Sequence, residues 1–245
     1  MPASSGPALP LADRNLPFVL VDDLSAPALS DHDLHHYRRV RRLSDGQPVV
    51  VGDGRGGWLP ARFATNPEPT GEVTVVAAPT PAITVGFVPV KAAKPEWVAT
   101  KLTELGVDEI VPIVSEHSVV RWDDARAAKV VERMIVAVRE ATQQSRRLHQ
   151  PRVAPAASLV DFIRDAPHAV LADPDGAPMP PATATIVVGP EGGFSDTERA
   201  ARACVALPGA VMRAETAAVV AGSMLVGLRS GVLGVGGPPT PGSTG

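Results

Sequence analysis

Residues 185–195 run from a short apolar stretch into a glycine-rich bend and then into the start of a helix. Residues 185–188 are typical of a buried strand, residues 189–193 (Gly-Pro-Glu-Gly-Gly) break it, and Ser195 with Glu198 has the spacing of a capping box. Glycines let a ligand approach the backbone closely, and ligands of open α/β sheets bind beyond the carboxyl ends of the strands. The pattern favours an α/β domain with a binding site at this bend.

The region around this bend alternates strands and helices from Ala82 onward, which is typical of a parallel sheet covered by helices. Lys94-Pro95 is expected to open a helix that Gly106 ends. The expected strands are 83–90, 109–114, 168–172, 184–188 and 210–212. The expected helices are 94–105, 123–145, 158–165, one starting at 196, and 214–232.

The N-terminal third has a different pattern. Strand-like runs at 17–22, 47–51, 58–63 and 71–77 are separated by Gly, Pro and Asn turns, with a helix expected from Ser30-Asp31 to Leu43. This predicts a small barrel-like domain that ends at the proline linker 78–81. We therefore expect domains at 17–78 and 82–233, with disordered ends at 1–16 and 234–245.

A second segment, 207–217, resembles the first in that a bend leads into the start of a helix. A Pro-Gly bend is followed by apolar residues and by Arg213-Ala214-Glu215-Thr216 at the start of an apolar helix. An arginine between an apolar strand and an apolar helix is costly to bury unpaired, so Arg213 should face a carboxylate, a phosphate or a cleft. Glu215 has the simpler alternative of complementing the helix dipole.

A glycine-rich turn at 52–57 offers another interpretation, a Rossmann-type nucleotide site. That motif needs a helix directly after the glycines, whereas Trp58–Phe63 contains a proline and alternates like a strand. A hairpin turn explains these glycines better. The Rossmann-type enzyme remains an alternative whose cofactor binding would depend on Gly54.

The formal net charge of −3 argues against a protein that binds nucleic acid over a uniformly basic surface. Contacts to a polyanion would have to come from two local patches, 35–42 and 146–152, each of which could instead be a solvated helix end. His32, His35 and His36 suit surface or RNA contact better than a metal site, so we expect no metal.

The single cysteine, Cys204, excludes an intrachain disulfide framework, and the N-terminus lacks the pattern of a signal peptide. The longest apolar stretch, 216–228, is shorter than the ~20 residues of a membrane span and is expected to be a buried helix. We therefore expect a cytoplasmic protein with no membrane partner.

An ordered set of motifs makes the comparison with known families specific. Lys101-x-x-Glu104-Leu105-Gly106, residues 144–147 (Gln-Ser-Arg-Arg), residues 189–193 and Arg213-x-Glu215-Thr216-Ala217 occur in the order found in the RsmE family of ribosomal RNA methyltransferases. Residues 35–42 and Asp53-Gly54 are similar to that family's PUA-like domain. The resemblance covers about 18–228.

The resemblance implies a SPOUT trefoil-knot methyltransferase domain preceded by a PUA-like RNA-binding β-barrel. It implies a cytoplasmic homodimer that uses S-adenosyl-L-methionine to methylate N3 of a specific uridine in 16S rRNA of the small ribosomal subunit. The implied cofactor-binding residues are Val188, Gly189, Pro190, Glu191, Gly192, Gly193, Leu207, Pro208, Gly209, Val211, Met212, Arg213 and Ala217. The implied RNA-binding residues are Arg38, Arg39, Arg41, Arg42, Lys94, Lys101, Arg146 and Arg147.

Attack by uracil N3 requires loss of its proton, which assigns chemical roles as hypotheses. Arg213 would polarise the uracil carbonyls or hold a phosphate, and Glu215 or Glu191 would accept the proton. Two departures affect the site: residues 208–210 are Pro-Gly-Ala where relatives carry Gly-Pro-Arg, and Leu148-His149 replaces Asn and Arg. A non-catalytic ribosome assembly factor is the remaining alternative, and it would not bind the cofactor.

Overall fold

The computed structural model describes residues 16–90, 94–119 and 122–233. The segments expected to be disordered, 1–16 and 234–245, therefore lie outside the described residues apart from Leu16. The described chain divides into two compact units. The N-terminal unit consists of residues 16–78 together with 139–150, and the C-terminal unit consists of residues 79–138 and 151–233.

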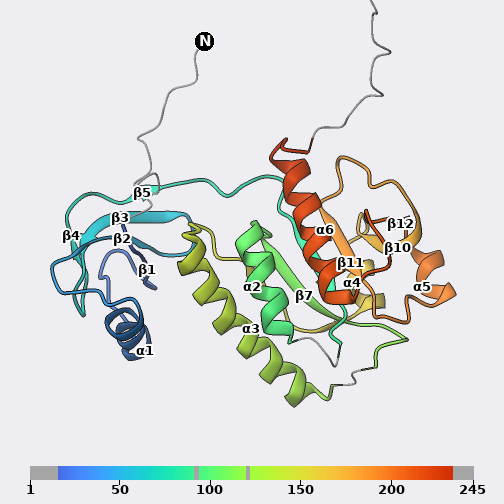
Figure 1. The fold of residues 1–245 in the computed structure, drawn as a ribbon, viewed down its shortest axis with the longest axis horizontal. Helices are drawn as coiled ribbons and strands as arrows, with labels where there is room; N and C mark the ends of the chain where they lie inside the picture. Colours follow the sequence, from blue (N-terminus) through green and yellow to red (C-terminus); the bar gives the residue numbers. More distant parts are fainter. Residues whose placement is uncertain (1–15, 91–93, 120–121, 234–245) are drawn as a thin grey trace, which may run out of the picture. The chain divides into compact units, whose positions relative to one another are not determined.

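The described part of the N-terminal unit holds a five-stranded sheet in the order β1-β2-β3-β4, with β5 also paired to β3 (blue to cyan in Figure 1). Its elements are β1 (Phe18–Leu20), α1 (Asp31–His35), the π-helical turn η2 (His36–Val40), β2 (Pro48–Gly52), β3 (Gly57–Arg62), β4 (Glu68–Pro69) and β5 (Thr74–Val75). Strands β2 and β3 are antiparallel neighbours joined by the turn at 53–56. The glycine-rich segment is therefore a hairpin, as predicted, and no helix follows it.

Residues 139–150, which the sequence analysis placed in the C-terminal domain, pack with the N-terminal unit. Arg139 donates to the carboxylate of Asp33, a buried residue of α1, over 3.0 Å. Leu148 is buried in an apolar cluster with Phe18, Leu20, Val50 and Trp58. An apolar side chain and a compensating cation thus hold this segment against the first sheet. The sequence did not indicate this packing, because the segment is far from residues 16–78 along the chain.

The C-terminal unit is an α/β fold around a seven-stranded sheet in the order β12-β10-β11-β6-β7-β8, with β9 also paired to β7. All its pairings in the described residues are parallel. Its elements are β6 (Thr84–Phe87), α2 (Pro95–Leu105), β7 (Glu109–Val114), α3 (Asp124–Ser145, ending in the N-terminal unit), β8 (Arg152–Val153), β9 (Ala157–Ser158), α4 (Leu159–Asp165), β10 (Val170–Ala177), β11 (Thr185–Val188), α5 (Asp196–Ala201), β12 (Cys204–Val205) and α6 (Ala214–Arg229). The parallel α/β class predicted from the sequence is confirmed.

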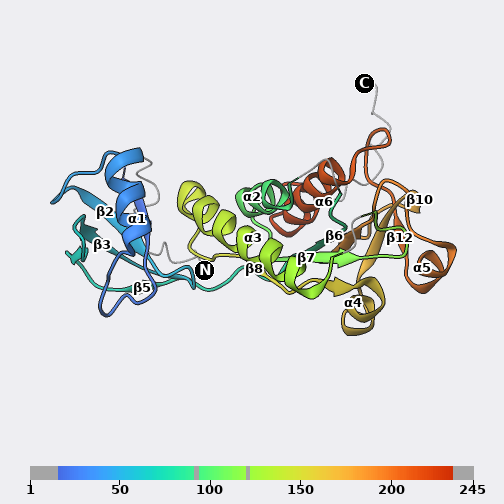
Figure 2. The same cartoon turned by 90° about the horizontal axis from the view of Figure 1, so that it is seen from below.

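Helices cover both faces of this sheet, as Figure 2 shows for α2 and α6 on one side and α4 on the other. Leu102 of α2, Met134 of α3 and Leu225 of α6 are fully buried against Val85 and Ile186 of the sheet. A second core on the opposite face holds residues of α4 and the buried ring of Phe194. Burial on both faces explains why the central strands are continuous apolar runs.

Local capping signals match the observed helix ends closely. Pro95 occupies the first turn of α2, and Gly106 ends it with φ of +107°, donating to Leu102 O and Thr103 O. The capping box at Ser195 and Glu198 is present at the start of α5. Both ends were predicted.

Several expected boundaries differ from the structure. The first helix ends at Val40 rather than Leu43, because Arg42 adopts a left-handed backbone with φ of +56°. The expected strand 71–77 is reduced to β5, and the last helix ends at Arg229 rather than 232. Strand β10 starts at Val170 and continues to Ala177, five residues beyond the expected end.

Candidate functional site

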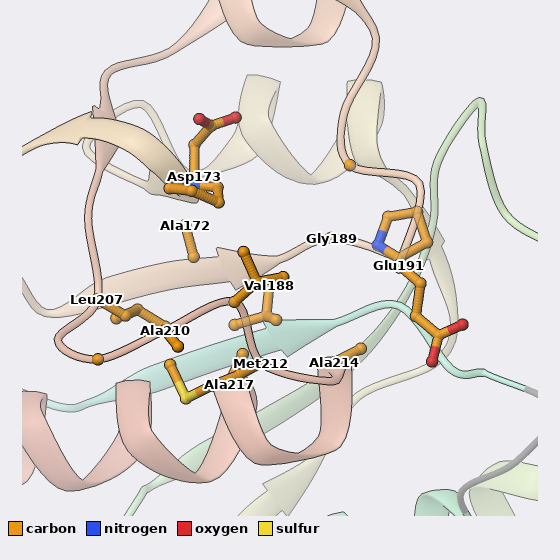
Figure 3. Close-up of a pocket in the computed structure, with 15 residues that line it drawn as sticks. Ala172, Asp173, Val188, Gly189, Glu191, Leu207, Ala210, Met212, Ala214 and Ala217 are labelled. Carbon is orange, nitrogen blue, oxygen red and sulfur yellow. The ribbon is translucent and has the colours of Figure 1, made fainter.

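A cavity of about 400 Å³ opens where β11 ends, beside residues 172–174 of β10 and the first turn of α6 (Figure 3). It is lined by the glycine-rich segment after β11, by the 207–212 segment between β12 and α6, and by residues 172–174 of β10. Its position at the carboxyl end of parallel strands is the usual place for a ligand in an α/β sheet. A volume of this size falls within the range of roughly 300–1,000 Å³ found for small-molecule sites.

Most residues expected to bind a cofactor line this cavity. They are Val188, Gly189, Pro190, Glu191, Gly193, Leu207, Gly209, Val211, Met212 and Ala217. Gly192, Pro208 and Arg213 were also expected but are not among its lining residues. Ala172, Asp173, Pro174, Ala210 and Ala214 line it without having been predicted.

The glycine-rich segment 189–193 forms a tight turn whose shape depends on its small residues. Gly193 has φ of +70° and donates its N–H to Pro190 O over 2.9 Å. A Cβ on Gly189 would lie only 3.0 Å from the buried ring of Phe194. At Gly189 and Gly193 the turn therefore presents backbone to the cavity, beside the lining residues Pro190 and Glu191.

Residues 210–212 are not the strand that the sequence analysis expected, and this prediction was wrong. They form an irregular segment in which Val211 is 88% exposed, while the neighbouring Gly209 has φ of +101°. The strand that pairs with β10 is instead β12, formed by Cys204 and Val205. The apolar side chains of Leu207 and Met212 face the cavity rather than a sheet neighbour, as Figure 3 shows.

The sequence did not predict that residues 172–174 of β10 line the cavity, because their position depends on an irregularity in strand pairing. The register between β10 and β12 shifts between Ala172 and Ala177, and residues 173–176 fall within this irregular stretch. Asp173 is 5% exposed, accepts the N–H of Asp175 over 3.0 Å, and lies 3.4 Å from Arg199 of α5. The Asp-Pro-Asp-Gly sequence at 173–176 was the available signal, since it is rich in turn-forming residues.

The three residues assigned to chemistry lie in different settings. Glu191 lines the cavity and is exposed, and Arg213 is exposed at the N-cap of α6. Glu215 faces a separate cavity of about 10 Å³ bordered by Phe87, Val88 and Val98, among others. Its buried Oε2 has no hydrogen-bond partner among the described residues.

Cysteine chemistry is disfavoured next to the cavity. Burial raises the pKa of the Cys204 thiol, and the nearby Asp173 carboxylate acts in the same direction. A protonated thiol is a poor nucleophile. The described residues also contain no group of three or more His, Cys, Asp or Glu side chains that could hold a metal ion.

Comparison with known proteins gives the family of the chain. Residues 77–226 match the model of the RNA methyltransferase domain family. The ribosomal RNA small subunit methyltransferases E of Mycobacterium bovis and Mycobacterium tuberculosis are each 32% identical to the chain, over 81% of this chain and 86% of theirs. The chain belongs to this methyltransferase family.

Solved structures of the family share the fold. A "probable rRNA-methyltransferase" from Porphyromonas gingivalis superposes with a TM-score of 0.71 and 28% identity, covering 89% of this chain and 100% of that one. The ribosomal RNA small subunit methyltransferase E of Neisseria gonorrhoeae, solved with S-adenosyl methionine bound, gives 0.73 at 24% identity, covering 86% and 96%. The latter likeness concerns the fold alone.

The arginines expected to bind RNA in the N-terminal unit are all exposed on or just after η2. Arg38 forms an ion pair with Asp45 over 2.9 Å, so part of its charge is already neutralised. For Arg39, Arg41 and Arg42, no ion pair occurs within the described part of the chain. These three are the cations of the first patch most available to a phosphate.

The other expected RNA contacts differ among themselves. Lys94 is exposed at the N-cap of α2, whereas Lys101 pairs with Glu104 over 2.8 Å. Arg146 and Arg147 are half-buried, and both have interaction partners within the protein. They are therefore less accessible than the sequence pattern suggested.

The departure from the family pattern at 148–149 has a structural explanation. Leu148 is 8% exposed within the core of the N-terminal unit. The ring of His149 donates through Nε2 to Val76 O over 3.0 Å. Both side chains stabilise the fold of their own unit instead of facing solvent.

The apolar stretch 216–228 is part of α6, as expected. Ala218, Ala221 and Leu225 are fully buried in the core of the C-terminal unit. No helix within the described ranges is long and apolar enough to cross a membrane.

Proposed function

We propose that this chain transfers a methyl group from S-adenosyl-L-methionine to N3 of one specific uridine in 16S rRNA. The observation that carries the proposal is the cavity formed by segments 188–193 and 207–212 in a chain of the small subunit methyltransferase E family. The relatives' name supplies the substrate RNA, and the cofactor found in the Neisseria structure supplies the donor.

The residues of the cavity fit such a donor. Leu207, Met212 and Val188 offer apolar surface to an adenine ring, and the segment around Gly189 and Gly193 offers backbone N–H and C=O groups to its polar atoms. Cβ atoms built on Gly193 and Gly209 would meet no protein atom within 4 Å, so these turns leave room for a ligand. The donor supplies a methyl group on a sulfonium, and the protein's task is to align it with the acceptor.

Arg213 is proposed to act on the RNA side of the site. It is exposed, sits at the start of α6 directly before the lining residue Ala214, and does not itself line the cavity. A guanidinium in this place can donate to the uracil carbonyls and stabilise the anion formed when N3 loses its proton. It can equally hold a phosphate of the same nucleotide.

For the proton of N3, Glu191 is the better placed of the two candidate carboxylates. It lines the cavity and is exposed to an incoming base, whereas Glu215 faces the separate small cavity. A general base must come within hydrogen-bond reach of the proton that it removes. E191Q should lower kcat strongly and flatten the rise of rate with pH, while E215Q should leave that rise intact; the opposite result would transfer the role to Glu215.

The target uracil must be unpaired or flipped out of an RNA helix to expose N3. The enzyme must therefore also bind the surrounding RNA. Arg39, Arg41 and Arg42 in the N-terminal unit and Lys94 in the C-terminal unit are proposed phosphate contacts because they are exposed. We also propose weaker phosphate contacts by Arg38, Lys101, Arg146 and Arg147. The domains 17–78 and 82–233 are proposed from the resemblance, except that segment 139–150 packs with the first unit. The PUA-like barrel, the trefoil knot, the homodimer and the cytoplasmic location are proposed from the resemblance as well.

The direct test is methylation of small-subunit rRNA taken from a strain lacking its own enzyme. The purified chain and S-adenosyl-L-methionine should produce one 3-methyluridine, detected by mass spectrometry of nuclease digests. Arg213→Ala should lower kcat by about 10²-fold or more if its guanidinium stabilises the transition state. Normal turnover with only weaker donor binding would remove Arg213 from catalysis.

A non-catalytic ribosome assembly factor, the alternative function, predicts a different result in the same assay. An assembly factor would bind the rRNA but would neither bind the donor in calorimetry nor form 3-methyluridine. A methyl group found on a different atom or nucleotide would contradict the proposed specificity while leaving the methyltransferase activity in place.

A further inference from the structure

The loop that follows β7, residues 115–118, lies against the glycine-rich turn of the donor cavity. Strands β11 and β7 flank β6 in the parallel sheet, so the segments after β11 and after β7 emerge at the same edge. Ser115 is 8% exposed, and its N–H donates to Ser118 Oγ over 2.8 Å, which gives the loop a defined shape. Two hydrogen bonds connect this loop to the segment 193–198.

The first connection runs through a buried carboxylate. Glu198 is 5% exposed, and its Oε2 accepts the N–H of Ser195 over 2.9 Å within the capping box. Its other oxygen, Oε1, accepts the N–H of Glu116 over 2.9 Å. A capping box needs only the first of these bonds, so the second is an additional link between two loops.

The second connection reaches the turn itself. Nδ1 of His117 lies 3.2 Å from the carbonyl oxygen of Gly193. Because a carbonyl oxygen only accepts, the ring donates through Nδ1. Gly193 lines the cavity in a left-handed conformation, so this bond acts on the part of the turn with the most conformational freedom.

We propose that His117 and Glu198 are positioning residues that hold the glycine-rich turn in its donor-binding shape. Neither lines the cavity, and their effect passes through the backbone of Gly193 and Ser195. The inference rests on the proposed function in one respect, namely that the donor occupies this cavity. It adds the loop 115–118, which no sequence motif had singled out, to the machinery of the site.

His117 provides the cleaner test because its side chain is exposed and its loss should not unfold the protein. His117→Ala should raise the Kd for S-adenosyl-L-methionine in calorimetry about three- to tenfold, the range expected for loss of one hydrogen bond. The KM for the donor should rise in parallel, with kcat within about twofold of the parent. His117→Asn, whose amide can donate from nearly the position of Nδ1, should restore most of the affinity.

Ser195 offers a matched control for Glu198. Ser195→Ala removes the bond from Glu198 N–H to Ser195 Oγ, but leaves both acceptor bonds of Glu198 in place. Glu198→Gln replaces one acceptor oxygen by a donor and so breaks one of the two. We therefore expect E198Q to weaken donor binding several-fold more than S195A, even if the two variants melt at similar temperatures.

The outcomes separate this inference from the proposed function. If the parent chain fails to bind the donor, the proposed function fails first. If the parent binds but H117A shows the parent Kd, or H117N is no better than H117A, the positioning role of His117 is overturned. Equal losses in E198Q and S195A would reduce Glu198 to an ordinary helix cap.

Discussion

Gly193 and Gly231 form a natural pair for separating backbone strain from donor binding. Their φ values are +70° and +71°, and a Cβ on either would meet no protein atom within 4 Å. Alanine at either position should therefore cost a similar ~1–2 kcal/mol of strain. Only Gly193 lines the cavity, so G193A should also weaken donor binding, by tenfold or more, whereas G231A should leave it unchanged. Calorimetry with both variants checks this, and equal affinities would argue against a donor at this turn.

Tyr37 is the single tyrosine of the chain, which makes its ionisation directly observable. Burial raises the pKa of Tyr37 well above its ordinary 10.0, although the Leu20 N–H that it accepts partly opposes this. Because the folded pKa exceeds the unfolded one, the neutral phenol contributes stability below pH 10 that is lost as the pH rises further. Tyrosinate absorbance near 295 nm should thus appear only together with unfolding. A tyrosinate signal near pH 10 in folded protein would show that the ring is accessible.

Where a local motif marks the backbone, residues expected at the site do lie at the cavity, and their binding of the donor stays a prediction. Residues 188–191 and Gly193 line the cavity, as the strand, bend and capping-box pattern indicated. Asp173 and His117 were missed for a physical reason. The place of Asp173 depends on where β10 shifts register against β12, and that of His117 on two loops meeting at one edge of a sheet. Neither relation is local in sequence.

Elements with their own start and stop signals were also predictable, as α2 between Pro95 and Gly106 illustrates. Two-residue strands such as β8, β9 and β12 were not, because a periodicity cannot be recognised over two residues. The strand predicted at 210–212 was wrong for a different reason. Its apolar side chains satisfied the pattern of a buried strand, but they border a cavity or face solvent.

The C-terminal turns of α3 provide a prediction at this scale. Arg139 donates to the buried carboxylate of Asp33 and also lies 3.3 Å from Asp22. Removing one partner of a buried pair leaves an uncompensated charge, and since the Arg139 side chain is 32% exposed we expect a moderate effect. Arg139→Ala should lower the free energy of unfolding by about 1–3 kcal/mol in urea titrations.

Arg164 is the control for this experiment. It pairs with Asp161 on α4, where both side chains are more than half exposed. Arg164→Ala should leave the free energy of unfolding almost unchanged, as is usual for exposed pairs. If R139A were as mild as R164A, the Asp33 pair would contribute little to holding segment 139–150.

For the whole molecule, the net charge of −3 means that RNA affinity must come from a few cations rather than from the overall field. Arg39 and Arg41 are exposed and have no ion-pair partner in the ranges that the structure describes. Replacing both by alanine should make the slope of log K against log salt shallower by about 1–1.5, since each phosphate contact contributes roughly 0.7 with single-stranded RNA. Binding assays from low to moderate salt measure this slope. An unaltered slope would restrict RNA contact to other surfaces.

The recruitment of residues 139–150 into the N-terminal unit has a consequence for biosynthesis. Residues 16–78 leave the ribosome long before residues 139–150. That later segment supplies Leu148 to the core of the N-terminal unit and Arg139 to the ion pair with Asp33. The first unit to be translated thus cannot complete its core until residues 79–138 of the second unit have also been made. Nascent chains arrested before residue 150 should therefore remain open to protease in a region that resists it once synthesis has passed that point.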